Sequence, residues 1–485
     1  MGHSLKILFA VAEASPLVKV GGLGDVAGSL PATLRRSGHD VRIIMPRYRS
    51  IDLAGYQCND CGNFFISFLE NQERVAINEV VLQDGTPVYL VENESYFDRP
   101  AVYGEADDLE RFLFFSRAVM EVPKRLDWQP DVLHSHDWHM GAIPALLKVA
   151  YRDDTFYSSC ASVYTIHNMG YQGWFDDSFA GRAGLYEYLP PSEDPIHSKS
   201  YSMMALGINH SDIISTVSKT YAAEILTPEY GMGLDELLQR RQDSLFGILN
   251  GIDYDQYNPA NDRLIAANYD SETLDKKVKN KLALQDKAGL PVDAGTPLLG
   301  LAARLVDQKG IDILADALDS LLNEANVQFV LQGTGDSKHE NILKMLESKY
   351  PDKARVFLVL DFSLARLIFA GSDMYLTPSR FEPCGLSHLI AMRYGAIPIV
   401  RHTGGLAETV PDCVSDLSSG LGFVFERYDA GELLMTLRRA LVAWQHENGW
   451  HQLMRRVVRS DFSWKSALSQ YEALYEMAIR KSTVS

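Results

Sequence analysis

Short apolar segments alternate along this chain with longer stretches in which apolar residues recur at helical spacing. That alternation is typical of a parallel sheet covered by helices. In the first half the predicted strands are 6–12, 41–45, 75–82, 88–91, 132–134, 162–166 and 213–217. The pattern starts again in the second half, at 298–302, 328–331, 356–359, 374–377 and 397–400. The sequence therefore predicts an α/β protein built from two Rossmann-like halves.

The segment 250–297 separates the two halves and has the composition of a linker. It begins with the turn signal Asn250-Gly251, continues through a charged helical stretch at 275–287 and closes on Gly295-Thr296-Pro297. A chain of 485 residues is also too long for one ordinary core. We expect an N-terminal domain at 1–255, a C-terminal domain at 256–460, and ligand binding in a cleft between them.

The last segment, 461–485, contains an amphipathic helix from about residue 466 to residue 481, which we expect to pack back on the N-terminal domain. Its apolar stripe is Leu468, Tyr471, Leu474, Tyr475 and Ala478.

Composition and charge narrow the class of protein. The apolar content of 46% and charged content of 22% are those of a soluble globular protein, and no segment has the length and apolarity of a membrane span. The net charge of −17 argues against nucleic acid as a partner. An anionic substrate would need lysines and arginines gathered locally against that overall field.

The five cysteines do not suggest a disulfide framework. Cys58 and Cys61 have C-x-x-C spacing, but no second pair completes a zinc site, so we interpret them as an incidental loop pair and expect no metal. The first predicted strand begins close to Met1, and we expect no targeting segment on the chain as given. A reducing compartment fits, either a bacterial cytoplasm or, for a mature form, a plastid stroma.

A glycine-rich loop, Lys19-Val20-Gly21-Gly22-Leu23-Gly24-Asp25-Val26, follows the first strand and leads into a helix ending near Arg36. Its backbone N–H groups and the start of the helix can approach an anion closely. The segment also satisfies G-x-G-x-x-A, the dinucleotide fingerprint. Here, however, the glycines lie too far past the strand, and Asp40 precedes the second strand instead of ending it.

The second half has its own charged strand-end segments. Arg304 and Lys309 follow the strand at 298–302, where a loop can direct both at one diphosphate. Glu382 follows the strand at 374–377 within Arg380-Phe381-Glu382-Pro383-Cys384-Gly385-Leu386. Ligands of open α/β sheets bind at the carboxyl ends of strands, where all three residues stand.

Polar and aromatic pairs occupy the corresponding positions of the first half. Asp137-Trp138 lies in His134-Ser135-His136-Asp137-Trp138-His139, and His167-Asn168 follows the strand at 162–166. A carboxylate beside an aromatic ring suits a sugar, and the histidine spacing matches no common metal pattern. Gly333-Thr334-Gly335-Asp336 and Gly404-Gly405 add two more strand-end turns. Their convergence in both halves favours one shared site.

Together these motifs resemble the bacterial-type glycogen and starch synthases, retaining glucosyltransferases of the GT-B architecture, over essentially the whole chain. The matching segments are 19–26, 134–139, 165–168, 249–253, 304–310, 378–386 and 403–406. The resemblance implies two Rossmann-like domains facing each other across a cleft that closes on the donor. It also implies transfer of glucose from ADP-glucose to the non-reducing end of an α-1,4-glucan or maltooligosaccharide, without a metal or other cofactor.

The resemblance also implies a role for each matching residue. Arg304 and Lys309 would neutralise the leaving diphosphate, Lys19 would close on the donor, and Glu382 and His167 would flank the transferred glucose. Same-face attack is favoured over a covalent intermediate, because only one carboxylate is well placed and retaining hydrolases use two. The predicted substrate-binding residues are Gly21, Gly22, Asp25, Asp137, Trp138, Asn168, Asn250, Cys384, Gly385, Leu386 and Ser387.

Several alternatives stay open at this stage. A related transferase using UDP-glucose or another acceptor would share most of these motifs. A glucan phosphorylase would need a pyridoxal phosphate lysine, which we do not find. A glucan-binding protein without activity would not need the diphosphate clamp. The chain departs from the family's pattern at Ser387-His388, at Glu408, and at Leu360, which takes the place of an aromatic residue near the adenine, with Phe362 two positions later.

Overall fold

The chain forms two compact units in the computed structural model, which describes residues 4–189 and 201–483. Unit 1 comprises Met1–Gly251 with Trp464–Ser485, and unit 2 comprises Ile252–Ser463. The predicted boundaries stood after residues 255 and 460. The chain passes from one unit to the other twice, near residues 251 and 463. These two segments are hydrogen-bonded to each other, since the N–H of Ile252 donates to the carbonyl of Phe462 at 2.8 Å.

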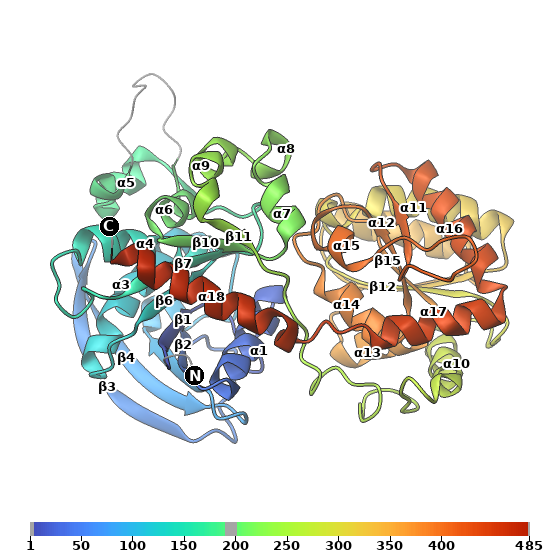
Figure 1. Ribbon diagram of the computed structural model, residues 1–485, viewed down its shortest axis with the longest axis horizontal. Helices are drawn as coiled ribbons and strands as arrows, with labels where there is room; N and C mark the ends of the chain where they lie inside the picture. The colour runs from blue at the N-terminus through green and yellow to red at the C-terminus, as the bar shows by residue number, and fades with distance from the viewer. Residues whose placement is uncertain (1–3, 190–200, 484–485) are drawn as a thin grey trace. The chain divides into compact units, whose positions relative to one another are not determined.

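Unit 1 is built on a nine-stranded sheet with the order β11-β10-β7-β6-β1-β2-β5-β4-β3 (Figure 1). The strands from β11 to β5 are parallel to their neighbours, as predicted. The strands of the unit are β1 (Lys6–Ala10), β2 (Asp40–Pro46), β3 (Cys58–Phe68), β4 (Asn71–Val81), β5 (Pro87–Glu92), β6 (Val132–His136), β7 (Ala161–Ile166), β8 (Trp174–Phe175), β9 (Tyr201–Ser202), β10 (Ile213–Thr216) and β11 (Leu245–Gly247).

The outer edge of this sheet differs from the predicted parallel pattern. β3 and β4 form a hairpin, and β4 also pairs antiparallel with β5. Cys58 and Cys61 lie on β3, not in a loop, beside a register shift between Asp60 and Asn63. The first part of β3 is polar because this edge strand faces solvent, so its sequence carries no apolar run.

Helices connect and cover the strands of unit 1. α1 begins at Gly22 and ends at Arg36, as the sequence predicts. The α-helices are α1 (Gly22–Arg36), α2 (Glu94–Phe97), α3 (Asp108–Arg125), α4 (Ala142–Ala145), α5 (Asp177–Ala183), α6 (Met203–His210), α7 (Lys219–Glu224), α8 (Pro228–Gly231), α9 (Asp235–Arg240) and α18 (Trp464–Ser482).

The carboxyl-terminal helix α18 belongs to the core of unit 1. It packs against α1, β6, β7 and β10, and the red helix crosses in front of these elements in Figure 1. The hydroxyl of Tyr475 lies 3.0 Å from Nδ1 of the buried His134 on β6. The side chains that α18 buries are Trp464, Ala467, Tyr471, Leu474, Tyr475 and Ala478.

Unit 2 has a six-stranded, wholly parallel sheet with the order β14-β13-β12-β15-β16-β17. Its strands are β12 (Leu298–Ala302), β13 (Gln328–Gln332), β14 (Ala354–Phe357), β15 (Met374–Thr377), β16 (Ile397–Arg401) and β17 (Phe423–Phe425). Its α-helices are α10 (Lys277–Lys287), α11 (Ile311–Glu324), α12 (Ser337–Lys349), α13 (Phe362–Gly371), α14 (Leu386–Arg393), α15 (Gly404–Thr409), α16 (Ala430–Trp444) and α17 (Glu447–Arg459).

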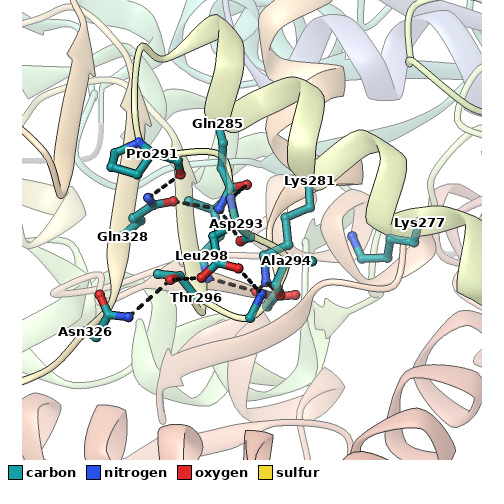
Figure 2. A network of polar contacts seen from close by, with 12 residues as sticks. Lys277, Lys281, Gln285, Pro291, Asp293, Ala294, Thr296, Leu298, Asn326 and Gln328 are labelled. Carbon is teal, nitrogen blue, oxygen red and sulfur yellow. Dashed lines mark hydrogen bonds and ion pairs between the residues drawn. The ribbon is translucent and has the colours of Figure 1, made fainter.

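A polar network anchors the start of β12 to α10 (Figure 2). The ammonium of Lys281 pairs with Asp373 at 2.7 Å, and the same carboxylate accepts from the N–H of Leu298 at 2.8 Å. Gln285 donates to Gln328 on the neighbouring strand β13 at 2.8 Å. These hydrogen bonds provide partners for buried polar groups and fix the position of β12. Arg304 lies just past the opposite end of that strand.

No helix in the described ranges is long and apolar enough to cross a membrane.

Candidate active site

In the sheet of unit 1, the order in which successive strands are added reverses between β1 and β6. From β1 the chain adds β2 and then β5 on one side, whereas β6 and β7 lie on the other. In open α/β sheets such a switch point forms a crevice at the carboxyl ends of the two central strands. The loop after β1 carries the glycine segment, and the turn after β6 carries Asp137 and Trp138.

Glu13, in the loop after β1, contacts the backbone of the glycine segment. Its carboxylate accepts hydrogen bonds from the N–H groups of Val20 and Gly21 and, at 3.1 Å, from the hydroxyl of Tyr103. Burial raises the pKa of Glu13, and the two backbone N–H groups oppose that rise. Two of the N–H groups that we expected to face an anion are therefore engaged by this carboxylate.

The remaining residues of the segment lie around this carboxylate. Lys19 pairs with Asp25, in the first turn of α1, at 2.7 Å. Gly21 and Gly22 stand at the start of α1, both at least partly exposed. A Cβ added at Gly24 would lie 3.0 Å from Oε2 of Glu13, so a glycine suits this close approach.

Asp137 holds the loop after β7. Its carboxylate accepts from the N–H of His167 at 2.7 Å and from the N–H of Asn168 at 3.4 Å. Burial raises the pKa of Asp137 to about 7 against the effect of these two bonds. The backbone of Asp137 has φ 57° and ψ 179°, a conformation that costs a non-glycine residue about 1–3 kcal/mol and concentrates at functional sites.

His167 is joined to the same cluster through its side chain. Its Nε2 lies 3.0 Å from Nδ1 of the buried His136, on β6. Burial lowers the pKa of His167 to about 3, so this imidazole is neutral at physiological pH. Trp138 packs on the backbone of Gly173, where an added Cβ would lie 2.2 Å from the indole. Asn250 is buried in the segment after β11, and its Oδ1 has no hydrogen-bond partner among the described residues.

Unit 2 has its own switch point, between β12 and β15. Here Lys309, after β12, pairs with Glu382, after β15, at 2.6 Å. Ser379 donates to the same oxygen of Glu382 at 2.7 Å. Burial opposes ionisation of Glu382, which is 5% exposed, but the charge of Lys309 and these hydrogen bonds outweigh it and lower the pKa. Glu382 is thus a buried carboxylate with one engaged oxygen.

Glycines bring the backbone of the neighbouring strands against the Glu382 turn. Gly404, with φ +47°, lies so close that an added Cβ would stand 2.0 Å from the carbonyl oxygen of Glu382. The N–H of Gly405 donates to that same carbonyl at 3.1 Å. After Glu382 the chain passes through the buried Cys384 and the left-handed Gly385, and then begins α14 with Leu386 and Ser387.

Two further features lie at this edge of unit 2. Arg304 stands exposed just beyond β12. After β14, Leu360 is 72% exposed and Phe362, the first residue of α13, is 65% exposed. An exposed apolar pair at a strand end can cover the face of a flat base.

No group of three or more His, Cys, Asp or Glu side chains in the ranges that the structure describes is placed to hold a metal ion.

Sequence reasoning assigned no role to Glu13, His136 and Ser379, which hydrogen-bond to predicted residues, or to Tyr103, which hydrogen-bonds to Glu13. Glu13 directly follows the first apolar run, and its position past a strand end could have singled it out. His136 lies in a strand-end segment that the sequence did single out, but only the folded chain shows that it contacts His167. Tyr103 carried no such signal, because only the folded chain brings it to Glu13.

Comparison with known proteins agrees with this architecture. Residues 6–240 match the family described as "Starch synthase catalytic domain", and residues 284–453 match "Glycosyl transferases group 1". The chain is 45% identical over 484 residues to the glycogen synthase of Moorella thermoacetica, covering 99% of this chain and 98% of that protein. It is 42% identical to the glycogen synthase of Thermotoga maritima, covering 98% and 99%.

Solved structures show the same likeness. The catalytic domain of starch synthase IV from Arabidopsis thaliana, bound to ADP and acarbose, superposes with a TM-score of 0.92 at 35% identity, covering 99% of this chain and 100% of that one. A sucrose-phosphate synthase from Thermosynechococcus elongatus shares the fold at a TM-score of 0.61 and 16% identity.

Two Rossmann-like units with charged and glycine-rich turns at their switch points define a glycosyltransferase of the GT-B class. Within that class, the chain belongs to the glycogen and starch synthase family.

Proposed function

We propose that the protein lengthens α-1,4-glucans, transferring glucose from ADP-glucose to the non-reducing end with retention of anomeric configuration. The observation that carries this proposal is identity of 45% to a glycogen synthase along the whole chain. The contact between Lys309 and Glu382 at 2.6 Å supports it, because it joins a cation suited to a diphosphate and a carboxylate suited to a sugar.

In unit 2, Arg304 and Lys309 neutralise the departing diphosphate. Lys309 has three donors, and one of them is used by Glu382. The other two remain for phosphate oxygens, so the lysine can serve both groups at once. Glu382 then holds the hydroxyls of the transferred glucose and stabilises positive charge that develops at the anomeric carbon.

The setting of Glu382 favours same-face attack over a covalent glucosyl-enzyme. One carboxylate oxygen already accepts from Lys309 and Ser379, which weakens it as a nucleophile. Retaining hydrolases use two carboxyl groups about 5–5.5 Å apart, whereas the partners of Glu382 here are a lysine and a serine. The acceptor hydroxyl would then attack on the face from which the diphosphate departs.

In unit 1, His167 faces the transferred sugar and Lys19 acts on the donor, together with Gly21, Gly22 and Asp25. Asp137 positions the His167-Asn168 loop by accepting both N–H groups. Trp138 offers an aromatic face to the acceptor, a common way to bind the apolar side of a sugar. Asn250 completes the sugar-binding group, and Cys384, Gly385, Leu386 and Ser387 shape the turn that presents Glu382.

The donor base would lie beside the segment that follows β14. Leu360 and Phe362 are exposed apolar residues near its expected position, as is the adjacent Val359, and none of them offers the base a polar side chain. The chemistry of the clamp is the same for ADP-glucose and UDP-glucose, so a choice between them depends on this edge. UDP-glucose is therefore the second candidate donor.

The test supplies labelled ADP-glucose and UDP-glucose in parallel with maltooligosaccharide and resolves the products by length. Extension from ADP-glucose at several times the rate from UDP-glucose is the expected result. Faster extension from UDP-glucose would correct the donor and keep the reaction. Absence of extension with either donor, while maltooligosaccharide still binds, would favour a glucan-binding protein without transfer activity.

A further inference from the structure

We propose that His136 is a positioning residue for His167: its Nδ1–H donates to Nε2 of His167 and keeps the proton of His167 on Nδ1. The two nitrogens lie 3.0 Å apart, within hydrogen-bond distance. The inference rests on the proposed function in taking His167 to face the transferred sugar. It goes further by assigning a role to His136 and a tautomer to His167.

Both rings are neutral, so either ring could be the donor in this hydrogen bond. Burial lowers the pKa of His136 well below its ordinary value, with the nearby His134 and His167 adding to the effect. Burial also lowers the pKa of His167 to about 3. Two neutral imidazoles share a single proton in such a bond, so one ring is the donor and the other the acceptor.

The other nitrogen of His136 decides the direction. Its Nε2 is buried and has no hydrogen-bond partner among the described residues. If Nδ1 accepted from His167, that Nε2 would carry a hydrogen with nowhere to donate. If Nδ1 donates, Nε2 carries only a lone pair. Orphaned buried N–H groups are the rarer of the two, which favours His136 as the donor.

Packing prevents the ring of His136 from turning away. Its ring stacks on Phe9 with centroids 5.2 Å apart at 24°, and it lies against His134 at 4.1 Å. His134 touches this ring by packing alone, so an apolar side chain of similar size at that position would keep the contact. Nδ1 of His136 therefore stays directed at His167.

The consequence for His167 is chemical. With Nε2 occupied as an acceptor, its other nitrogen, Nδ1, carries the proton and is the nitrogen open to a ligand on this partly exposed side chain. His167 then donates a hydrogen bond to a sugar hydroxyl oxygen and does not act as a base. Because the tautomer of His167 is already fixed before the sugar binds, no entropy is lost on binding by selecting one tautomer.

The unpartnered Nε2 gives a way to separate this role from a structural one. An apolar side chain of similar size in place of His136 removes one buried unsatisfied atom but leaves Nε2 of His167 without its donor. These two effects oppose each other, so the melting temperature should change little. If His136 only stabilised the fold, its replacement would lower the melting temperature and leave kcat of the folded protein unchanged. Loss of transfer at unchanged or higher stability is the signature of positioning.

The experiment compares four full-length proteins: wild type, His136→Leu, His136→Asn and His134→Leu. For each, kcat and KM for ADP-glucose and the melting temperature are measured, and the histidine tautomers are read by NMR on ¹⁵N-histidine-labelled protein. Asn places an amide donor near the position of Nδ1 and is the conservative variant. His134→Leu removes an equally buried histidine of the same strand that is not hydrogen-bonded to His167.

We expect the proton of His167 on Nδ1 in wild type and in His136→Asn. In His136→Leu we expect kcat about tenfold lower with KM for ADP-glucose within about twofold, and His136→Asn should recover most of the loss. His134→Leu should lower the melting temperature and leave kcat within about twofold.

A proton on Nε2 of His167 in wild type would overturn the proposal. So would an unchanged kcat in His136→Leu, or an equal loss of kcat in His134→Leu, since the contact to His167 would then not be the cause. The NMR measurement needs no turnover. A wild type that extends no glucan but carries the proton on Nδ1 would therefore contradict the proposed function and leave the tautomer assignment supported.

Discussion

At the scale of single residues, the carboxylates of Glu382, which is buried, and Asp137, which is half-buried, have opposite electrostatic settings. Burial alone would raise both pKa values. Glu382 has Lys309 at 2.6 Å, whose charge outweighs burial and lowers the pKa. Asp137 has only backbone N–H groups, and its pKa rises to about 7. A nearby cation therefore decides which of the two is ionised throughout the physiological range.

Replacing Lys309 with methionine tests this explanation for Glu382. The carboxyl would keep its burial and lose its cation, so its pKa should rise, and the acid limb of the transfer rate should move to higher pH. The rate near pH 7 should also fall about 100-fold or more, because a donor to the diphosphate is lost. Chain extension from about pH 5 to about pH 8 measures both effects.

The control for that variant is Lys338→Met. Lys338 pairs with Asp307 at 3.6 Å and is 69% exposed, so its loss should change little. An acid limb that does not move in Lys309→Met would contradict the assignment of the lowered pKa to Lys309.

For Asp137 the sign of the pH effect is reversed. Between the unfolded pKa of about 3.9 and the folded value of about 7, the folded protein binds the extra proton, so this group makes stability fall as pH rises. Asp137→Asn should therefore raise the melting temperature more at about pH 8 than at about pH 5, while transfer falls about 100-fold. Calorimetry at both pH values and a transfer assay check it.

The exposed Asp84, which accepts from the N–H of Thr86 at 2.8 Å, provides the matched control. Asp84→Asn should shift the melting temperature alike at both pH values. A uniform shift in Asp137→Asn as well would show that Asp137 ionises normally in the fold.

At the scale of elements, close backbone contacts position the turn that carries Glu382. Gly404 is the first residue of α15, and its backbone lies so close to the carbonyl of Glu382 that no side chain fits between them. The turn is thus held from the neighbouring strand β16, in addition to its own strand β15. Any shift of α15 moves the carboxylate, and misplacement by about 1 Å can cost about 100-fold in rate.

Gly404→Ala makes this testable against Gly420→Ala. Both glycines have positive φ, and an added Cβ would lie 2.0 Å from a carbonyl oxygen at Gly404 and 2.4 Å at Gly420. Both variants should lose stability by a few kcal/mol. Only Gly404→Ala should also lower kcat in the folded fraction, by about tenfold or more. Equal kcat values per folded molecule would contradict the positioning role.

The elements also differ in how far they could be predicted. Buried parallel strands such as β1 and β12 are nearly continuous apolar runs, and the sequence predicts them well. β3 was missed because half of this edge strand is polar and exposed. β11 and β17 have three residues each, too few for a periodic signal.

At the scale of the whole molecule, unit 1 is completed by the end of the chain. α18 buries six side chains in the core of a unit whose other residues end at 251. At about 1.5–3 kcal/mol for each buried apolar side chain, the helix contributes on the order of 10 kcal/mol. That is comparable to the total stability of an ordinary domain, about 5–15 kcal/mol.

A fragment of residues 1–251 should therefore fail to melt cooperatively, whereas the same fragment with 464–485 joined through a short flexible linker should do so. The fragment 252–463 should melt cooperatively by itself, because its sheet and helices are complete. Circular dichroism melts and protease resistance compare the three. A cooperative transition in 1–251 alone would show that α18 is dispensable for the fold of unit 1.

The sequence by itself determined which residues stand just past the strand ends, because apolar runs, glycines and charged turns are local features of the chain. Only the tertiary structure decided which of them are neighbours. Glu382 and Lys309 are 73 positions apart, and His136 and His167 are 31 apart. Their contacts depend on sheet order, and the pKa values of Glu382, Asp137 and His167 depend on burial. Both arise when distant segments pack together, so no local pattern encodes them.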